Sequence, residues 1–135
     1  MNLYDKDDGF KLFDIEQANA LLPAIIEKTE RALYELNALQ TEIEAKQLFD
    51  QEFAQERYYE KSAPILEKWS EEMIEIGVYP KGYFTVDFKS PVPDTLFCWT
   101  YGETEINHTH KIYETFKARR PIHDSNKFGF EEALN

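Results

Sequence analysis

Apolar residues recur at helical spacing in the first half of the chain. Between residues 22 and 47 the spacing alternates steps of four and three, a coiled-coil-like seam that becomes polar towards its end. Pro23 lacks a backbone donor and disfavours helix at the residue before it. The pattern therefore predicts a short helix over residues 15–21 and a much longer one from about residue 23 to residue 50. The seam consists of Leu22, Ile26, Thr29, Leu33, Leu36, Gln40, Ile43 and Gln47.

The start of this helical region carries a recognisable cap. Asp14 and Gln17 have the spacing of a capping box, in which each side chain accepts a hydrogen bond from the backbone N–H of the other residue. Phe13, directly before them, is placed to pack back onto the first turn. These three residues predict that the helix begins directly after Asp14.

A second helical pattern runs from about residue 52 to residue 76. Pro64 interrupts the pattern, so the helix either kinks or begins there. Gly77 is a natural stop because glycine readily adopts the left-handed conformation that closes a helix. The two long helices are predicted to pair as an antiparallel hairpin, with a turn near residues 48–54.

After Gly77 the apolar period changes from the helical value to two, the period of a strand. Residues 83–88 form the first predicted strand, with its phenylalanines and Val86 on one face and Asp87 on the opposite face. Two prolines make residues 89–94 a predicted loop.

Two further strands are predicted beyond this loop. The aromatic-rich segment 95–101 forms one, and residues 105–112 form the other. Four side chains are expected to share one face of the last strand, namely Ile106, His108, His110 and Ile112. The tail over residues 122–135 is predicted to be either flexible or a short helix docked through Phe128 and Phe130.

These elements predict an α+β protein, in which a long antiparallel helical hairpin packs with a small antiparallel β-sheet. We expect a single domain over residues 1–135, since this length is typical of one domain. The domain would comprise a helical part (14–76), a β-rich part (77–121) and the tail (122–135).

The distribution of charge separates the two parts further. The chain has a net charge of −11, from 26 acidic and 15 basic residues. Residues 14–76 contain 15 acidic and 6 basic residues, whereas residues 77–135 contain 8 and 7 and also hold 11 of the 20 aromatic residues. An acidic surface repels phosphate backbones, so we expect no nucleic-acid partner. We expect the chemistry in the nearly neutral second part, with the acidic helices mainly as a scaffold.

Cysteine usage and hydropathy suggest a compartment. Cys98 is the single cysteine, so it cannot form an internal disulfide, and its bulky neighbours Phe97 and Trp99 indicate a buried thiol. The first residues lack the apolar core of a signal peptide, and no apolar run approaches the ~20 residues that span a membrane. We expect a cytoplasmic protein with no membrane partner.

The stretch from Phe13 to Pro23 reads Phe-Asp-Ile-Glu-Gln-Ala-Asn-Ala-Leu-Leu-Pro. It resembles the start of a family of uncharacterised bacterial proteins called domain of unknown function 2203. Further short motifs agree with that family in order and spacing, and the resemblance covers about residues 13–122. These motifs are Val86-Asp87-Phe88, Cys98-Trp99, Gly102-Glu103, Ile106, His110 and Arg119-Arg-Pro-Ile122.

The chain departs from the family pattern in two places. Thr109 stands where a tryptophan is usual, and Thr115 and Ala118 stand where glycines are usual. The resemblance implies the outline of the fold and implies no activity.

A metal site is one hypothesis for the β-rich part. On a strand, His108 and His110 would point to the same face, and His-x-His can supply two metal ligands. Asp87 or Glu103 could add an oxygen ligand, and such a set suits zinc, manganese or iron. In this reading the cofactor is a divalent transition metal. The alternative is that histidine and carboxylate hydrogen-bond to each other and only hold a turn.

A polar ligand site without any cofactor is the leading hypothesis. Basic side chains cluster at residues 117–120, and a guanidinium group is suited to bidentate contact with a carboxylate or a phosphate. A site built from Asp87, Glu103, His110 and Arg119 could therefore hold a small anionic ligand. The alternative is that Arg119 pairs internally with Asp87 or Glu103.

An enzymatic role receives less support from the sequence. Glu103 and His110 could share a proton-transfer task. No nucleophile stands in a recognised setting, and the surroundings of Cys98 suit burial better than reactivity. The sequence favours a binding or assembly module over an enzyme.

Self-association is a further hypothesis. The apolar seam with its acidic flanks could close two hairpins into a four-helix bundle, which predicts a homodimer through the helical hairpin. The alternative is that the seam packs only within its own chain. A lone hairpin would expose Trp69 and Met73 unless the strands or a partner cover them.

Overall fold

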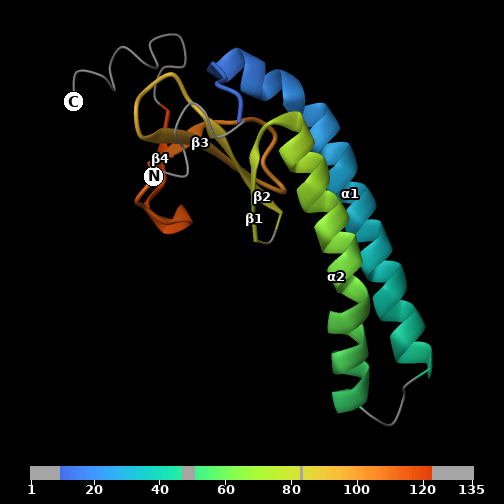
Figure 1. Ribbon diagram of the computed structural model, residues 1–135. Coiled ribbons are helices and arrows are strands. Elements are labelled where there is room, and N and C mark those ends of the chain that lie inside the picture. The colour runs from blue at the N-terminus through green and yellow to red at the C-terminus, as the bar shows by residue number, and fades with distance from the viewer. Residues whose placement is uncertain (1–9, 47–50, 83, 123–135) are drawn as a thin grey trace.

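The computed structural model describes residues 10–46, 51–82 and 84–122. Within these residues two long helices are followed by a five-stranded antiparallel sheet (Figure 1). The predicted α+β class, a helical hairpin packed with an antiparallel sheet, is confirmed. The elements in order are α1 (Ile15–Lys46), α2 (Gln51–Ile76), β1 (Tyr79–Lys81), β2 (Thr85–Lys89), β3 (Thr95–Thr100), β4 (His108–Lys111), the 3-10 helix η2 (Phe116–Ala118) and β5 (Arg120–Pro121).

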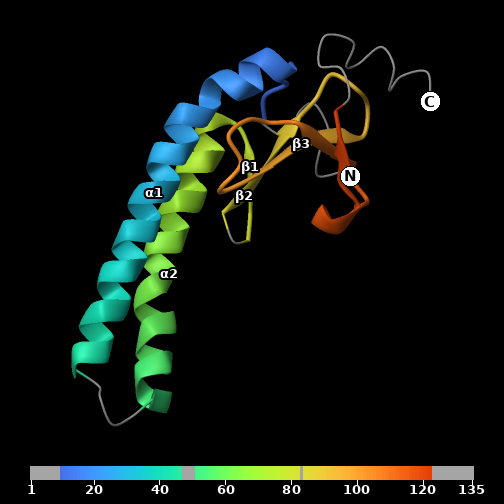
Figure 2. The same cartoon turned by 180° about the vertical axis from the view of Figure 1, so that it is seen from behind.

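The two helices lie side by side, and their far halves extend beyond the sheet (Figure 2). The predicted seam of α1 is confirmed at Leu22, Thr29 and Ile43, which are all buried. The predicted turn near residues 48–54 overlaps the start of α2, and residues 47–50 lie outside the described residues.

Pro23 lies inside α1, so the prediction of two separate helices was wrong. The proline removes the hydrogen bond to the carbonyl of Asn19, four residues earlier. The first turns of α1, dark blue in Figure 1, bend relative to the rest of the helix, as an internal proline often causes. The helix continues because Ala18 before the proline and Ile25 after it are buried in the same core.

The predicted start of α1 and the predicted end of α2 are both confirmed. Gln17 N donates to Asp14 Oδ1 at 2.7 Å and Asp14 N donates to Gln17 Oε1 at 3.0 Å, which completes the capping box. Gly77 has φ +105°, and the N–H groups of Gly77 and Val78 bond back to the last turn of α2. This is the Schellman arrangement that satisfies the terminal carbonyls of a helix. Pro64 lies within α2 and does not begin it.

Each strand pairs antiparallel with the next, in the order β1-β2-β3-β4-β5. Side chains alternate between two faces of the sheet. One face packs on the helices and contributes Val86, Phe88, Phe97 and Trp99 to the core. The opposite face carries polar side chains, including Asp87.

The third predicted strand is shorter than expected. β4 covers His108–Lys111, and Ile106 precedes it in the core, where its N–H donates to Asn19 Oδ1 at 2.7 Å. Ile106 therefore does not share a face with the histidines, contrary to the prediction. The sequence pattern did not predict β1, which has three residues, or β5, which has two.

The sheet covers the apolar surface that a lone hairpin would expose. Trp69 and Met73 are 3% and 0% exposed. The ring of Trp69 meets Phe84 edge-on at 5.0 Å, and its indole N–H donates to Thr29 Oγ1 at 2.9 Å. The hairpin and the sheet thus share one core within the chain.

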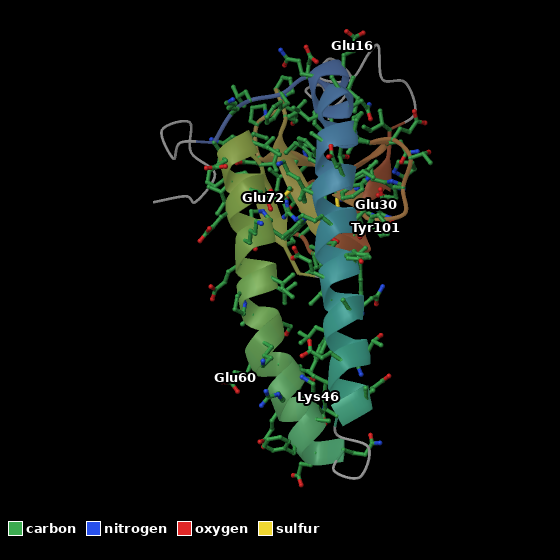
Figure 3. The ribbon with its side chains drawn as sticks, turned by 90° about the vertical axis from the view of Figure 1, so that its right-hand side faces the viewer. Glu16, Glu30, Lys46, Glu60, Glu72 and Tyr101 are labelled. Atoms are coloured by element: carbon green, nitrogen blue, oxygen red, sulfur yellow. The ribbon has the colours of Figure 1, made fainter. Side chains whose placement is uncertain are left out.

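Polar contacts on the surface join the same elements. Tyr101, directly after β3, donates its hydroxyl to Glu30 of α1 at 3.0 Å, and the two side chains lie together in Figure 3. Arg31 Nη1 donates to Glu72 Oε2 at 2.9 Å and Lys28 Nζ to the same oxygen at 3.2 Å. The bond to Arg31, with help from Lys28, outweighs burial and lowers the pKa of Glu72 to about 2.

The C-terminal tail and the hydropathy of the helices were also subjects of prediction. The predicted tail, with Phe128 and Phe130, lies outside the described residues apart from Ile122. Among the described helices, none is both long enough and apolar enough to cross a bilayer.

Candidate functional site

A cavity of about 530 Å³ lies over the face of the sheet that points away from the helices. The three central strands supply its floor: Asp87 is paired with Cys98 in the β2–β3 register, and His110 on β4 lies diagonally across from Cys98, because its own partner is Leu96. Asp87 comes from β2, Cys98 from β3 and His110 from β4. The remaining lining residues are Lys81, Gly82, Thr85, Thr100, Ile112, Glu114 and Thr115.

Asp87 and His110 form a buried ion pair in this floor. Asp87 Oδ1 lies 3.0 Å from His110 Nε2, and the two residues are 1% and 6% exposed. His110 Nδ1 lies 2.8 Å from the carbonyl of Lys111, and a carbonyl only accepts, so Nδ1 carries a proton. Burial opposes the charged imidazole, but the hydrogen bond and the charge of Asp87 outweigh burial and raise the pKa of His110.

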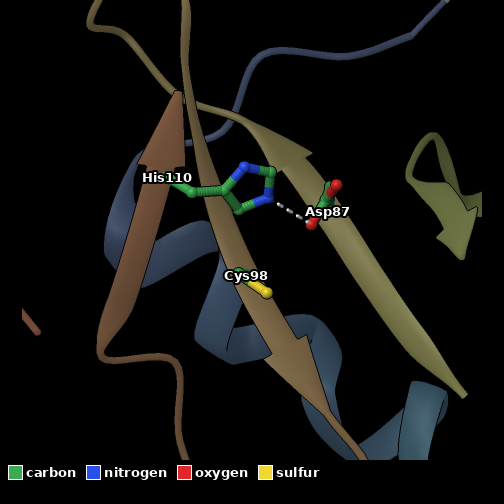
Figure 4. A group of neighbouring side chains, drawn as sticks. All are labelled: Asp87, Cys98 and His110. Atoms are coloured by element: carbon green, nitrogen blue, oxygen red, sulfur yellow. Dashed lines mark hydrogen bonds and ion pairs between the residues drawn. The ribbon is translucent and has the colours of Figure 1, made fainter. Parts of the chain in front are cut away.

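Cys98 lies beside this pair, on the strand between the two strands that carry it (Figure 4). It lies directly opposite Asp87 in the β2–β3 register and is 1% exposed, so the predicted buried thiol is confirmed. Burial and the nearby charge of Asp87 raise the pKa of the thiol to about 12, although the nearby Arg119 favours the thiolate.

The donor atoms of these three side chains converge. One oxygen of Asp87, the sulfur of Cys98 and one nitrogen of His110 all lie within 4.8 Å of one another (Figure 4). Among the described residues, these three form the group of histidine, cysteine and acidic side chains whose donor atoms converge this closely. An arrangement of three such donors from adjacent strands can hold a metal ion or a network of hydrogen bonds.

Glu103, in the connection between β3 and β4, and Arg119, directly before β5, form a second pair. Arg119 Nη1 donates to Glu103 Oε1 at 3.0 Å and Nη2 lies 2.9 Å from Oε2, a bidentate contact. Glu103 Oε1 also accepts the N–H of Thr100 at 2.9 Å. Arg119 therefore pairs within the chain, and its partner is Glu103, as the alternative hypothesis for this residue predicted.

The four predicted ligand-binding residues thus form two pairs, Asp87–His110 and Glu103–Arg119. Cys98 is close enough to both pairs that Asp87 raises the pKa of its thiol and Arg119 lowers it. The pairs are built from complementary charges, so each pair already satisfies much of its own hydrogen-bonding capacity.

The alternative metal set is divided in the same way. His108 and His110 do share a face of β4, as the spacing predicted. His108 Nδ1, however, lies 3.6 Å from Glu103 Oε2, whereas His110 contacts Asp87. The converging group contains Cys98 in place of His108 and Glu103. Cys98 was missed as a site residue because its apolar neighbours indicated only burial, and its place opposite Asp87 depends on a β2–β3 register that the sequence pattern does not specify.

A second hollow, of about 820 Å³, lies between the far ends of the helices. It is lined by side chains such as Gln40, Glu44 and Tyr59, which are exposed. Its lining includes no buried ionisable group, so we place the candidate site on the sheet.

A comparison with models of protein families identifies the family of the chain. The model of the family DUF2203, described as an uncharacterized conserved protein, matches residues 11–122. The chain belongs to this family. The resemblance inferred from the sequence motifs is thereby confirmed.

The DUF2203 match covers every described helix and strand, from the start of α1 to the end of β5. The description of DUF2203 names no reaction and no ligand. No curated protein and no solved structure matches the chain. The function must therefore be argued from the site itself.

Proposed function

We propose that this DUF2203 protein is a binding module for a divalent transition metal, held by Asp87, Cys98 and His110. The observation that carries the proposal is the convergence of three donor atoms within 4.8 Å on the floor of a cavity. Atoms bound to one zinc ion each lie about 2.0–2.3 Å from it, which puts them about 3–4 Å from one another. The donors need only small shifts to reach that arrangement.

The kinds of donor select the class of metal. A thiolate, an imidazole and a carboxylate form a mixed sulfur, nitrogen and oxygen set. Such a set suits zinc and related first-row ions, whereas calcium and magnesium prefer oxygen ligands alone. We therefore take Zn²⁺ as the test ion.

The surroundings of His110 support the same proposal. Its Nδ1–H donates to the backbone carbonyl of Lys111 at 2.8 Å, which fixes the ring and turns Nε2 towards Asp87 and Cys98. A ligating histidine usually makes such a bond with its other nitrogen. Metal binding would release the protons of the Cys98 thiol and of His110 Nε2, so the affinity should increase with pH.

The competing account is that the buried Asp87–His110 pair only holds β2 and β4 together. A paired carboxylate and imidazole can persist in a core without any functional ligand. The two accounts differ in the part played by Cys98, which a structural pair does not require.

Metal content separates the two accounts. The protein should be purified without a histidine tag, reconstituted with Zn²⁺, desalted and analysed by inductively coupled plasma mass spectrometry. We expect stoichiometric zinc in the wild type and in His108→Gln, the matched control on the same strand. We expect loss of zinc in Cys98→Ser and in His110→Gln.

Circular dichroism should accompany each variant, because a variant that has not folded cannot report on the site. Zinc that is absent from the folded, reconstituted wild type would overturn the proposal. Zinc that persists in both Cys98→Ser and His110→Gln would do the same.

The predicted homodimer remains a separate proposal. Trp69 and Met73 no longer support it, because the sheet covers them. In the part of the hairpin that the structure describes, the exposed large apolar side chains are Tyr34, Phe53, Tyr59, Leu66 and Ile74. A mass near 16 kDa by light scattering at micromolar concentration would reject self-association.

A further inference from the structure

We infer that the metal at Asp87, Cys98 and His110 keeps an open coordination position that takes a small anionic ligand from the cavity. This inference rests on the proposed metal site and goes beyond it, because it assigns a class of ligand. The ligand would be a monodentate carboxylate, thiolate or comparable small anion that bonds the metal directly.

The number of donors supports an open position. Structural zinc sites close the ion with four protein ligands, whereas sites that bind an exogenous molecule keep three. Within the described residues the converging group has three members. Glu114 also lines the cavity, but its carboxylate is engaged by both terminal nitrogens of Arg120, at 3.1 and 2.7 Å, and by the N–H of Lys111 at 2.8 Å.

The charges around the ion favour an anion. A divalent ion bound to one carboxylate, one thiolate and one neutral imidazole carries no net charge together with these ligands. Lys81 Nζ stands 3.8 Å from Asp87 Oδ2 at the wall of the same cavity and adds a positive charge. The charge of Glu114 is balanced by Arg120. Among the described residues at the cavity, the charges of the ion, its three ligands and Lys81 thus sum to a positive value, which favours an anion.

The cavity also limits the size of the ligand. A volume of about 530 Å³ is in the usual range for a small-molecule site and is too small for a folded partner. Thr85 and Thr100 place hydroxyl groups beside the cluster, where Thr85 Oγ1 donates to Thr100 Oγ1 at 2.9 Å. These hydroxyls can turn to serve a polar ligand as donors or acceptors.

Spectroscopy of the cobalt-substituted protein tests the inference. Co²⁺ should replace Zn²⁺ in the full chain, and sodium azide should be titrated as the probe anion while the visible d–d bands are recorded. We expect a saturable shift of these bands, which reports a new ligand on the metal. Lys81→Met should weaken azide binding by about two- to five-fold, the size typical of one partly exposed charge. Lys117→Met, an exposed lysine outside the cavity lining, should leave it unchanged.

The outcomes separate this inference from the proposal beneath it. Co²⁺ that binds through Cys98 but keeps an unchanged spectrum at millimolar azide would overturn the open position and leave the metal site standing. Co²⁺ that does not bind would overturn both. A spectral shift that Lys81→Met and Lys117→Met weaken equally would overturn the assignment of the ligand to this cavity.

Discussion

Asp87 Oδ1 and His110 Nε2 meet at 3.0 Å across β3, the strand that separates them in the sheet. Their side chains therefore bridge second-neighbour strands beside the sulfur of Cys98 (Figure 4). A bridge of this kind places two opposite charges in a buried position, where each depends on the other. It also forms part of the proposed metal site, so its energetics should be measured on metal-free protein.

Removing the charge of Asp87 tests the strength of this bridge. Asp87→Asn in chelator-treated protein is expected to lower the free energy of unfolding by about 3 kcal/mol, because it leaves a buried imidazole without its carboxylate. Urea denaturation followed by circular dichroism measures the change. Asp94→Asn is the control, since Asp94 is exposed at φ +58°, a conformation that asparagine tolerates. A change of less than about 0.5 kcal/mol for Asp87→Asn would show that the bridge adds no stability.

The contact between the helices contains one buried hydrogen bond that can be removed without changing the shape of the core. Thr29 and Trp69 are 0% and 3% exposed, and the indole N–H donates to Thr29 Oγ1 at 2.9 Å. Thr29→Val should cost about 1–3 kcal/mol because it leaves the indole N–H buried and unsatisfied. Thr41→Val, at an exposed position of the same helix, should stay within about 0.5 kcal/mol. Equal effects of the two variants in thermal denaturation would contradict this account.

Acid should weaken the link between α1 and α2 through Glu72. The pKa of Glu72 is lowered from 4.5 to about 2 by Arg31 and Lys28, so the folded state binds its proton less readily than the unfolded chain does. The resulting stability is present above pH 4.5 and is lost as the pH falls towards 2. We expect this contribution to be about 1–3 kcal/mol after screening by solvent.

Urea denaturation of wild type and Glu72→Gln between pH 7 and pH 2 checks this prediction. The two proteins should differ in the free energy of unfolding because only the wild type carries the carboxyl group with the lowered pKa. The stability difference between the two proteins should shrink as the pH approaches 2. Glu75→Gln, an exposed position on the same helix, should follow the wild-type profile. A constant difference between wild type and Glu72→Gln over this range would contradict the assignment.

The junction of α2 with the sheet depends on Gly77. Its φ of +105° disfavours any residue with a Cβ, and a Cβ there would lie 3.0 Å from the side chain of Lys11. Gly77→Ala is expected to cost about 1–2 kcal/mol. Gly82→Ala is the matched control because its Cβ would meet no atom within 4 Å, and it should change stability by less than about 1 kcal/mol. Similar melting temperatures for the two variants would contradict the role of Gly77.

Local chemistry explains which parts of the fold could be predicted from the sequence. The capping box of Asp14 and Gln17 and the stop at Gly77 are determined by neighbouring residues, and both are confirmed. Pro23 misled the prediction because its local preference is overcome by core contacts on both sides. β1 and β5 are too short to show an alternating pattern, and only their pairing with longer strands defines them.

The site could be predicted only in part for a related reason. Asp87 and His110 were recognisable as polar residues on predicted strands. The meeting of Asp87 with Cys98 depends on the register between β2 and β3, which the alternation within one strand does not specify. The sequence therefore indicated the correct face of the sheet and missed the sulfur at its centre.

We propose that Cys98 ligates a metal together with Asp87 and His110. The most direct measurement is the near-ultraviolet absorption of the Co²⁺-loaded protein, since a thiolate bound to Co²⁺ gives an intense charge-transfer band. We predict this band in the wild type and in His108→Gln, and its loss in Cys98→Ser. A folded wild type that binds Co²⁺ without the band, or does not bind Co²⁺ at all, would contradict the claim.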